Sequence, residues 1–420
     1  MRVLVVTTYY APDLGPGAAL FTMLCEDLVR LGHQVSVLAA VPHYPTGNVP
    51  QAFRGAWARR ETTAGVDVTR VWVPSVNRAD LWKRLATFTV FQVLATLFGP
   101  RRNYDVVVAG NPALEIFLPF AVLAAARGKP AIFSVHDLYP EVGVRLGIFR
   151  HRSVIFLIKW MEDFCLKRAK CVRVLSDGFR DAIRSRGVED SRILLVWDWL
   201  DPDFIRPLPR VNSLSANWSL DGRFVALYAG NIGLSQGLEC ILQAASLLSS
   251  EPSIRILLVG DGAGKRALQE RAAQAALWNV EFFPFQPRED LPLVLATADV
   301  SLICLKRGVS GDSVPSKFFS ILASARPVIA SVDHGSDTWK LVQSANCGVC
   351  VPPEEPKAMA DAILALYRDP ERRASFGSNG REYVVVNHSR TSAAQRFHEA
   401  ISNLTGTAKT QEPLVAHSQG

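Results

Sequence analysis

The chain has 420 residues, of which 49% are hydrophobic and 20% charged, as expected of a globular protein with full cores. It is too long for one ordinary domain, and two domains of about 200 residues are expected. Its seven cysteines are odd in number and scattered, which argues against a disulfide framework and for a reducing compartment.

The net charge of +7 is unevenly distributed along the chain. Residues 1–200 hold 25 Lys and Arg against 17 Asp and Glu, a balance of +8, whereas the remainder holds 21 against 22, a balance of −1. A basic first half suits nucleic acid, an anionic membrane surface or a phosphorylated substrate. An ordinary solvated basic surface is an equal alternative.

The longest apolar run, Leu85–Gly99, is interrupted by polar residues and is shorter than the roughly 20 residues that span a bilayer. No signal peptide is evident at the N-terminus. We therefore expect a soluble or peripheral protein. The run is flanked by Lys and Arg, which is typical of an interfacial helix, although a core helix of the first domain has the same pattern. Arg145–Arg173 is a second basic stretch, with Trp160 and Phe164 interleaved.

The first half alternates predicted strands with predicted helices, which indicates a doubly wound parallel sheet. The first strand is a continuous apolar run that ends in the loop Tyr9–Gly17, and a helix follows to Arg30. The predicted strands are Val3–Thr7, Gln34–Ala39, Val66–Val73, Asp105–Ala109, Ala131–Val135, Cys171–Leu175 and Ile193–Val196.

Residues 201–222 are rich in proline without periodicity, so they are predicted to be a linker between a first domain at 1–200 and a second at 223–380. The second domain repeats the alternation. Its predicted strands are Phe224–Ala229, Arg255–Val259, Val280–Phe283, Val300–Ile303, Val328–Ala330 and Val349–Val351. A helical region at 381–404 is predicted to return to the first domain, and residues 405–420 are predicted to be a disordered tail.

Glycine-rich turns follow the first two strands of the second domain. Gly230-Asn231-Ile232-Gly233 precedes a helix that opens near Gln236, where glycines let a backbone approach a diphosphate. The spacing is not that of a dinucleotide fingerprint, and no acidic residue follows about 20 residues later, which disfavours a dehydrogenase. Gly260 and Asp261 form the second turn, for which a nucleotide site and a simple tight turn are equal alternatives. Phe285 follows the third strand, where its backbone could meet a base edge, but an ordinary loop with buried aromatic residues is favoured.

Pro315-Ser316-Lys317 opens a predicted helix whose apolar residues recur at steps of three and four. The free N–H groups of a helix start, with the Lys317 ammonium, suit a phosphate or diphosphate. Asp312 and Ser320 lie eight positions apart around this start, and Asp312 is a candidate acceptor for sugar hydroxyls.

In the first domain, His136 and Asp137 follow a predicted strand, and we expect Asp137 to orient the imidazole; a structural histidine is as plausible. Two other patterns have ordinary explanations. Cys347 and Cys350 have CxxC spacing without a second pair, so we expect the approach to a strand. Asp201-Pro202-Asp203 resembles a carboxylate pair for a metal but is predicted to be turn chemistry.

Taken in order, these motifs resemble glycosyltransferase family 4, most closely the WbuB/WcaI-like branch of bacterial O-antigen and exopolysaccharide assembly. The similarity runs from Met1 to about Arg396. It rests on the ordered series Asp13–Gly17, Gly32–Val35, Pro42–Gly47, His136–Glu141, Gly230–Gly233 with Gln236-Gly237, Pro315–Lys317 and Arg326–Ile329.

This resemblance implies a GT-B fold, in which two Rossmann-like parallel-sheet domains face each other across a cleft. It implies the nucleotide-sugar donor on the second domain, the acceptor on the first, and a retaining transfer that needs no metal or other cofactor. Implied catalytic residues are Lys317, His136 and Asp312. Implied donor-binding residues are Gly230, Asn231, Gly233, Gln236, Gly260, Asp261, Phe285, Ser316 and Ser320. Implied acceptor or cleft residues are Gly15, Gly17, His43, Asp137 and Glu141.

The sequence departs from the wider family at both ends of the donor site. Asp312 and Ser320 stand where two Glu are usual, and Asn231 and Gln236 stand where Arg and Lys are usual. We expect a cytoplasmic enzyme, peripheral to the inner face of the plasma membrane, that uses a UDP- or GDP-sugar and a polyprenyl-diphosphate-linked glycan, with no nucleic-acid partner. A nucleotide-sugar epimerase of the same shape and a non-catalytic binding protein are the alternatives.

Overall fold

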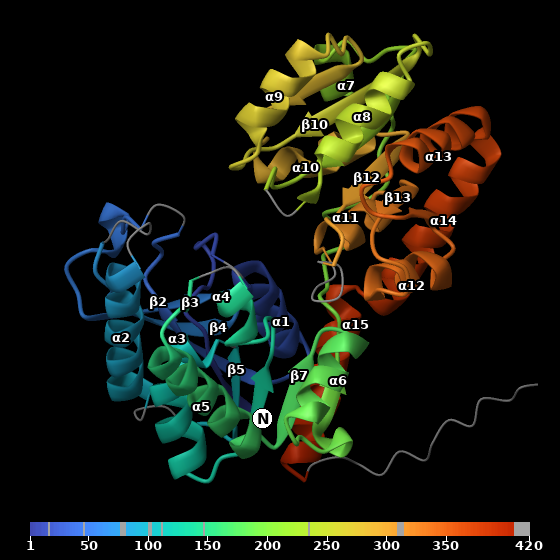
Figure 1. Cartoon of the computed structure of the whole chain (residues 1–420). Helices are drawn as coiled ribbons and strands as arrows, with labels where there is room; N and C mark the ends of the chain where they lie inside the picture. The colour runs from blue at the N-terminus through green and yellow to red at the C-terminus, as the bar shows by residue number, and fades with distance from the viewer. Residues whose placement is uncertain are drawn as a thin grey trace, which may run out of the picture. The chain divides into compact units, whose positions relative to one another are not determined.

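The computed structural model describes residues 1–15, 17–44, 47–75, 81–99, 103–110, 112–145, 148–233, 236–308 and 315–406. The chain forms two compact units (Figure 1). Unit 1 comprises Met1–Trp197 together with Arg390–Gly420, and unit 2 comprises Asp198–Ser389. Each unit is built on one sheet flanked by helices, so the predicted pair of parallel-sheet α/β domains is confirmed.

The sheet of unit 1 has the strand order β3-β4-β2-β1-β5-β6-β7-β8. All neighbours are parallel except β3 and β4, which form an antiparallel hairpin that the sequence analysis missed. β3 is polar and mostly exposed, as an edge strand can be, and therefore lacks the apolar signal of its neighbours. The strands are β1 Arg2–Val6, β2 Gln34–Ala40, β3 Ala58–Thr63, β4 Val66–Val71, β5 Val106–Gly110, β6 Ala131–Ser134, β7 Cys171–Val174 and β8 Ile193–Leu195.

Helices cover the sheet of unit 1, and the last helix of the chain returns to it. Arg390 opens that helix, α15, and donates to Asp27 and Glu26 of α1, both at 2.7 Å. The helices are α1 Ala18–Arg30, α2 Leu81–Phe98, α3 Ala113–Pro119 with its π-helical continuation Phe120–Ala126, α4 Glu141–Arg145, α5 Arg152–Arg168, α6 Asp177–Ser185 and α15 Arg390–Leu404.

The apolar run of the first domain forms α2, which packs on the core through Phe88, Phe91 and Ala95. Its outward side leaves Val93 and Leu97 exposed, so the core interpretation accounts for most of the helix. Among the described residues, no helix combines the length and the hydropathy needed to cross a bilayer.

The sheet of unit 2 is parallel throughout, with the order β11-β10-β9-β12-β13-β14. The chain starts in the middle at β9, winds outward to β11, then crosses to β12 on the other side of β9. In such a sheet, ligands bind at the carboxyl ends of the two strands where the winding reverses, here β9 and β12. The strands are β9 Phe224–Ala229, β10 Ile254–Val259, β11 Val280–Phe283, β12 Val300–Cys304, β13 Val328–Ser331 and β14 Gly348–Val351.

The helices of unit 2 are α7 Ser213–Asn217, α8 Glu239–Leu247, α9 Lys265–Gln274, α10 Leu291–Ala296, α11 Lys317–Ala323, α12 Asp337–Ser344, α13 Pro356–Arg368 and α14 Pro370–Asn387. α14, which has glycines in its middle, was not predicted before residue 381. The predicted helical region 381–404 divides into the end of α14, which belongs to unit 2, and α15, which returns to unit 1. The glycines of α14 let it approach α11 closely. A Cβ on Gly377 would lie 2.3 Å from the Ala325 carbonyl oxygen, and one on Gly380 would lie 2.9 Å from the Leu322 side chain.

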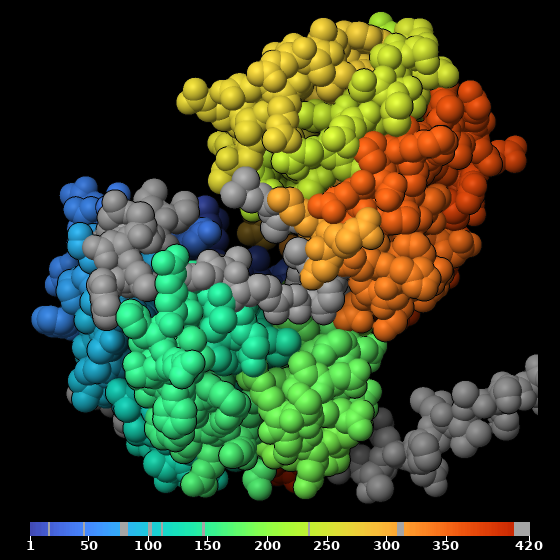
Figure 2. All heavy atoms as spheres, viewed as in Figure 1, coloured from blue at the N-terminus to red at the C-terminus, as the bar shows by residue number. Residues whose placement is uncertain are grey.

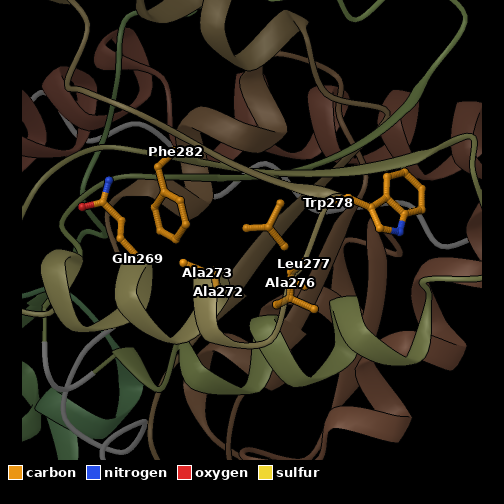
Figure 3. A pocket seen from close by; sticks show the side chains of 8 residues that line it. Gln269, Ala272, Ala273, Ala276, Leu277, Trp278 and Phe282 are labelled. Atoms are coloured by element: carbon orange, nitrogen blue, oxygen red, sulfur yellow. The ribbon is translucent and has the colours of Figure 1, made fainter.

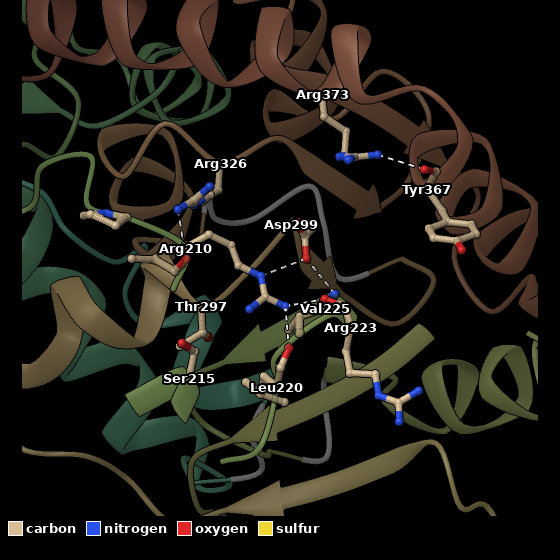
Figure 4. Close-up of polar contacts among 12 residues, drawn as sticks. Arg210, Ser215, Leu220, Arg223, Val225, Thr297, Asp299, Arg326, Tyr367 and Arg373 are labelled. Atoms are coloured by element: carbon tan, nitrogen blue, oxygen red, sulfur yellow. Dashed lines mark hydrogen bonds and ion pairs between the residues drawn. The ribbon is translucent and has the colours of Figure 1, made fainter. Parts of the chain in front are cut away.

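The proline-rich segment predicted as a linker is part of unit 2, because arginines from the body of that unit bind its backbone. Arg326 donates to the Leu208 carbonyl at 3.0 Å, and Arg381 donates to the Ile205 carbonyl at 2.9 Å. From within the segment, Arg210 pairs with Asp299 at 3.1 Å (Figure 4). The division therefore lies at Trp197 and Asp198, and residues 201–222 pack on the second unit.

Two smaller predictions for unit 2 are confirmed. The Asp201 carboxylate accepts a 2.9 Å bond from the Asp203 N–H, which is turn chemistry. Cys347 directly precedes β14 and Cys350 lies within it, and both are free thiols.

The main chain passes between the two units twice, at 197–198 and at 389–390. The two passages adjoin, since the Leu200 N–H donates to the His388 carbonyl at 3.0 Å and Leu200 forms a β-bridge with Ser389.

Candidate functional site

The turns that follow β9 and β10 interlock at the carboxyl end of the unit 2 sheet. The Ile232 N–H donates to the Asp261 carbonyl at 2.8 Å, and the Gly264 N–H donates back to the Ile232 carbonyl at 2.9 Å. Gly260 has φ +150°, and a Cβ on it would lie 1.9 Å from the Gly230 carbonyl oxygen. Only glycine permits this approach, so the two turns form one backbone surface at the switch point.

Lys317 is directed into the unit and not into solvent. Its Nζ lies 3.8 Å from the centroid of the Tyr228 ring and 3.3 Å from Gln236 Oε1. A Cβ added to Gly230 would lie 3.9 Å from the same Nζ. The ammonium therefore adjoins the turn after β9, so the start of α11 and the Gly230–Gly233 turn lie next to each other.

The environment of this ammonium opposes its charge. Burial lowers the pKa of Lys317 to about 8, and proximity to Cys304 only partly offsets that shift. Among the described residues, its contacts are the Tyr228 ring face, which attracts a cation, and one amide oxygen, that of Gln236. A dianionic ligand at the adjoining turn would supply the missing counter-charge.

Gln236 offers Lys317 an acceptor oxygen, which the basic residue usual at this position in the wider family would not. Its Oε1 accepts from Lys317 and, at 3.2 Å, from the Tyr228 hydroxyl. The Tyr228 hydroxyl also donates to the Asn231 carbonyl at 2.6 Å. A lysine at 236 would instead place a second ammonium beside Lys317. Tyr228 itself was missed, because on the sequence it is one more apolar position of a buried strand.

Two further lysines surround the turns and were also missed. The Lys265 Nζ donates to the Gly260 carbonyl at 2.8 Å, so it braces the second turn at the start of α9. Lys306 follows β12, and its Cγ would lie 3.4 Å from a Cβ on Gly237, which has φ +61°. Both lysines lie next to glycine-rich turns, and that neighbourhood was the only signal available in the sequence.

The other residues predicted to bind the donor are more exposed or have fewer contacts than Lys317 and the glycine turns. Ser316 directly precedes α11, as predicted, and its side chain accepts no hydrogen bond from the first turn of the helix. Ser320 is on the same side of α11 as Lys317, three positions on. Asn231 and Asp261 are exposed, and Phe285 is 58% exposed after β11. Asp312 is outside the described residues.

In unit 1 the loops after β1 and β2 are bonded to each other through Asp13. One carboxylate oxygen accepts from the Gly15 N–H and the other from the His43 N–H, both at 2.9 Å. His43 is buried, stacks on Tyr9 and bonds the Val41 carbonyl through Nδ1 at 2.9 Å. The predicted cleft residue His43 is therefore a packed residue that shapes these loops. Gly17, with φ +75°, leads into α1.

His136 follows β6, half-buried, with both ring nitrogens bonded. Its Nε2 lies 3.2 Å from Ser134 Oγ, and its Nδ1 lies 3.3 Å from an Arg173 nitrogen. A guanidinium only donates, so Nδ1 accepts and the neutral ring carries its proton on Nε2. Arg173, fully buried and bonded to the Val196 carbonyl at 2.6 Å, thus helps to orient the ring, a role that the sequence analysis gave to Asp137. Asp137 is exposed.

Glu141 opens α4 and forms an ion pair with Arg186. The predicted unit 1 residues thus fall into two groups, one around Asp13 and one around His136.

A hollow of about 390 Å³ lies elsewhere on unit 2, between α9 and the edge strand β11 (Figure 3). Leu277, Trp278 and Phe282 line it, and it shares no residue with the candidate donor site. Within the described ranges, no cluster of three or more His, Cys, Asp or Glu side chains suitable for a metal ion is present.

Comparison with known proteins assigns both halves of the chain. Residues 15–199 match the model of the glycosyl transferase 4-like domain, and residues 214–383 match that of the glycosyl transferases group 1. The chain is 28% identical over 374 residues to the putative colanic acid biosynthesis glycosyl transferase WcaI of Escherichia coli K12, covering 86% of this chain and 91% of WcaI.

Solved structures show the same fold at low identity. Sucrose-phosphate synthase from Thermosynechococcus elongatus is similar with a TM-score of 0.73 and 19% identity, over 97% of this chain and all of that one. Anabaena HepE, solved in complex with UDP, is similar with a TM-score of 0.70 and 16% identity, over 96% of this chain and all of that one. With two family models matched in tandem over most of its length, the chain belongs to the glycosyltransferases of family 4, which have the GT-B fold.

Proposed function

We propose that this glycosyltransferase moves a sugar, with retention of configuration, from a UDP- or GDP-sugar to a lipid-linked glycan in the synthesis of a cell-surface polysaccharide. WcaI, by its name a colanic acid enzyme, and HepE, solved with UDP, support the polysaccharide and the nucleotide parts of the proposal. The observation that carries it is the enclosed Lys317 ammonium beside the Gly230 turn at the switch point of unit 2.

The chemistry proposed for unit 2 is stabilisation of a leaving group. The bond between the anomeric carbon of the donor and its phosphate oxygen breaks, and the acceptor oxygen bonds to that carbon from the same face. The acceptor proton passes to the departing phosphate oxygen, so the protein need not supply a base. Lys317 and the turn amides bind the nucleoside diphosphate as its charge develops, and one such donor is typically worth about 3 kcal/mol of barrier.

The remaining predicted residues have positioning tasks in this proposal. Ser320 is assigned to the nucleoside side of the donor, because it lies one turn along α11 from Lys317. His136 is assigned as a hydrogen-bond donor to sugar or acceptor hydroxyls, which would take its Nε2 proton in place of Ser134 Oγ. The transfer is proposed to need no metal, so an excess of EDTA should leave turnover unchanged.

A thermal-shift screen with UDP, GDP and a panel of their sugars tests the donor half of the proposal. We expect one nucleotide series to raise the melting temperature of the wild-type chain, and Lys317→Met to abolish the shift. Lys340→Met is a matched control, because Lys340 is an exposed lysine of unit 2 whose side chain is 66% accessible. If no nucleotide raises the melting temperature of the wild type, the proposal is wrong.

Two further measurements separate transfer from its alternatives. Mass spectrometry of membrane extracts incubated with the stabilising donor should show a glycan heavier by one sugar, and NMR of the new linkage gives its configuration. Deuterium entering the donor sugar from solvent without acceptor would instead indicate an epimerase. Nucleotide binding without any product would indicate a non-catalytic relative.

A further inference from the structure

The outer side of α5 in unit 1 exposes large apolar side chains. Phe156 is 73% exposed, Leu157 52% and Trp160 49%. The opposite side of the helix is buried in the core through Met161 and Cys165. Residues three and four positions apart share a side of a helix, so the three exposed residues form one stripe where a solvated helix would place polar side chains.

This stripe continues onto α3, which packs beside α5 (Figure 1). The Phe117 ring lies 5.2 Å from that of Trp160 and 5.3 Å from that of Phe164. Leu118, the next residue of α3, is 36% exposed, and its N–H donates to Gln92 Oε1 of α2 at 2.9 Å. We call the exposed residues of α5 on this surface, Phe156, Leu157 and Trp160, the α5 patch.

The charge around the α5 patch is strongly positive. Residues 148–170 contain six basic side chains, Arg150, Arg152, Lys159, Lys167, Arg168 and Lys170, against two acidic ones. Of the acidic pair, Glu162 is buried, and Asp163 is bonded to Lys159 at 3.0 Å. Arg152 and Lys167 are both exposed, and Lys167 is on the side of the helix that carries Trp160.

Aromatic residues bordered by Lys and Arg match the boundary of an anionic bilayer, where rings lie at headgroup depth and cations meet phosphate. A second copy of this chain fits less well, because two such surfaces would bring like charges together. α5 is also exposed to the viewer in the space-filling view of unit 1 (Figure 2).

We propose that the α5 patch docks unit 1 on an anionic membrane, with Phe156 and Trp160 entering the headgroup boundary and Arg152 and Lys167 binding lipid phosphates. The inference deepens the proposed function, since it names the surface that brings the enzyme to a lipid-linked acceptor. The docking can be measured by vesicle binding, without any sugar transfer.

Co-sedimentation of the full chain with vesicles tests the docking. The wild type should bind vesicles of phosphatidylcholine and phosphatidylglycerol, bind those of phosphatidylcholine alone more weakly, and lose affinity as salt rises. The double variant Phe156→Ser/Trp160→Ser should bind about tenfold or more weakly. Trp57→Ser is the matched control, because Trp57 is 66% exposed in unit 1 outside the α5 patch, and should bind as the wild type does.

A second double variant is needed because Trp160 also contacts Phe117 and Phe164, so its substitution could disturb the fold. Arg152→Glu/Lys167→Glu changes only exposed side chains and should abolish the preference for phosphatidylglycerol. The inference is overturned if the wild type ignores both vesicles or if both double variants bind normally. It is also overturned if sedimentation shows that the patch variants convert a dimer to a monomer while vesicle binding is absent.

Thermal shifts with nucleotide on the same preparations separate the two proposals. Nucleotide binding retained in a wild type that does not bind vesicles would remove the docking inference alone. Vesicle binding by a wild type that ignores every nucleotide would remove the proposed function alone.

Discussion

Tyr228 and Gln236 stabilise the charged form of the buried Lys317 side chain, but only in part. A ring face and one amide oxygen compensate an ammonium only in part, so its charged form is less favourable in the folded chain than in water. The pKa of about 8 expresses that difference. A nucleoside diphosphate would reverse it, because an opposite charge nearby favours the ammonium.

The substitution Lys317→Met should therefore stabilise the ligand-free protein while it abolishes donor binding. At pH 7 the lysine is protonated both folded and unfolded, so the folded state bears the full cost of the buried charge, on the order of 3 kcal/mol for a pKa lowered from 10.5 to about 8. Between pH 8 and the ordinary lysine pKa only the unfolded chain keeps the proton, so wild-type stability rises with pH and the gap to the variant closes. Denaturant unfolding of both proteins at pH 7 and pH 10 measures this, and an unchanged gap would contradict it.

A second prediction concerns Asp13, where the isosteric substitution Asp13→Asn tests whether both carboxylate oxygens act as acceptors. Both carboxylate oxygens accept from backbone N–H groups, so Asp13→Asn points an NH₂ group at one of two donors. We expect Asp13→Asn to destabilise the protein nearly as much as Asp13→Ala, by about 2 kcal/mol. The measurement is chemical denaturation of the three proteins; an Asn variant as stable as the wild type would exclude this bonding.

Among the elements, the paired turns after β9 and β10 depend on close backbone approach. Gly260→Ala would place a methyl group against the Gly230 carbonyl at a φ that side chains rarely adopt. We expect it to cost about 2 kcal/mol or more and to weaken nucleotide binding at least tenfold. Gly222→Ala is the control, because Gly222 also has a positive φ but an added Cβ would have nothing within 4 Å. This variant should be less stable than the wild type but should bind nucleotide equally well in a thermal-shift titration.

The sequence predicts elements well where apolar runs mark them. β9 and β11 begin and end where they were expected, because continuous apolar runs bounded by polar or glycine residues leave little choice. β3 and the first part of α14 were missed for opposite reasons. β3 is a polar edge strand, and α14 contains glycines that local propensity counts against a helix but that packing on α11 requires.

The candidate site shows the same limit at the level of side chains. Lys317 and the Gly230 turn could be predicted, because a lysine at a helix start and glycines after a strand are local signals. Tyr228 and Arg173 could not, since each acts through a partner distant in the sequence, Lys317 and His136, respectively.

For the whole molecule, the position of the division between units predicts which fragment folds. The donor candidates all lie within Asp198–Ser389, and the first part of that range is bound by arginines from the rest of it. We expect Asp198–Ser389 expressed alone to unfold cooperatively and to bind the nucleotide that stabilises the full chain.

The fragment 223–380 is the matched comparison. It lacks α7, the Arg210 side of the ion pair with Asp299, and the Arg381 bonds. We expect it to melt without cooperativity in circular dichroism. Equal stability of the two fragments would mean that the proline-rich segment is a passive connector after all.

The double passage of the main chain means that unit 2 is inserted within unit 1. On the ribosome, residues 1–197 emerge first, but α15, whose Arg390 binds Glu26 and Asp27 of α1, is translated last. The N-terminal half must therefore wait, with one flank of α1 uncovered, while the whole intervening unit is synthesised. A nonsense codon just before Arg390 would leave unit 2 complete and unit 1 permanently without its last helix.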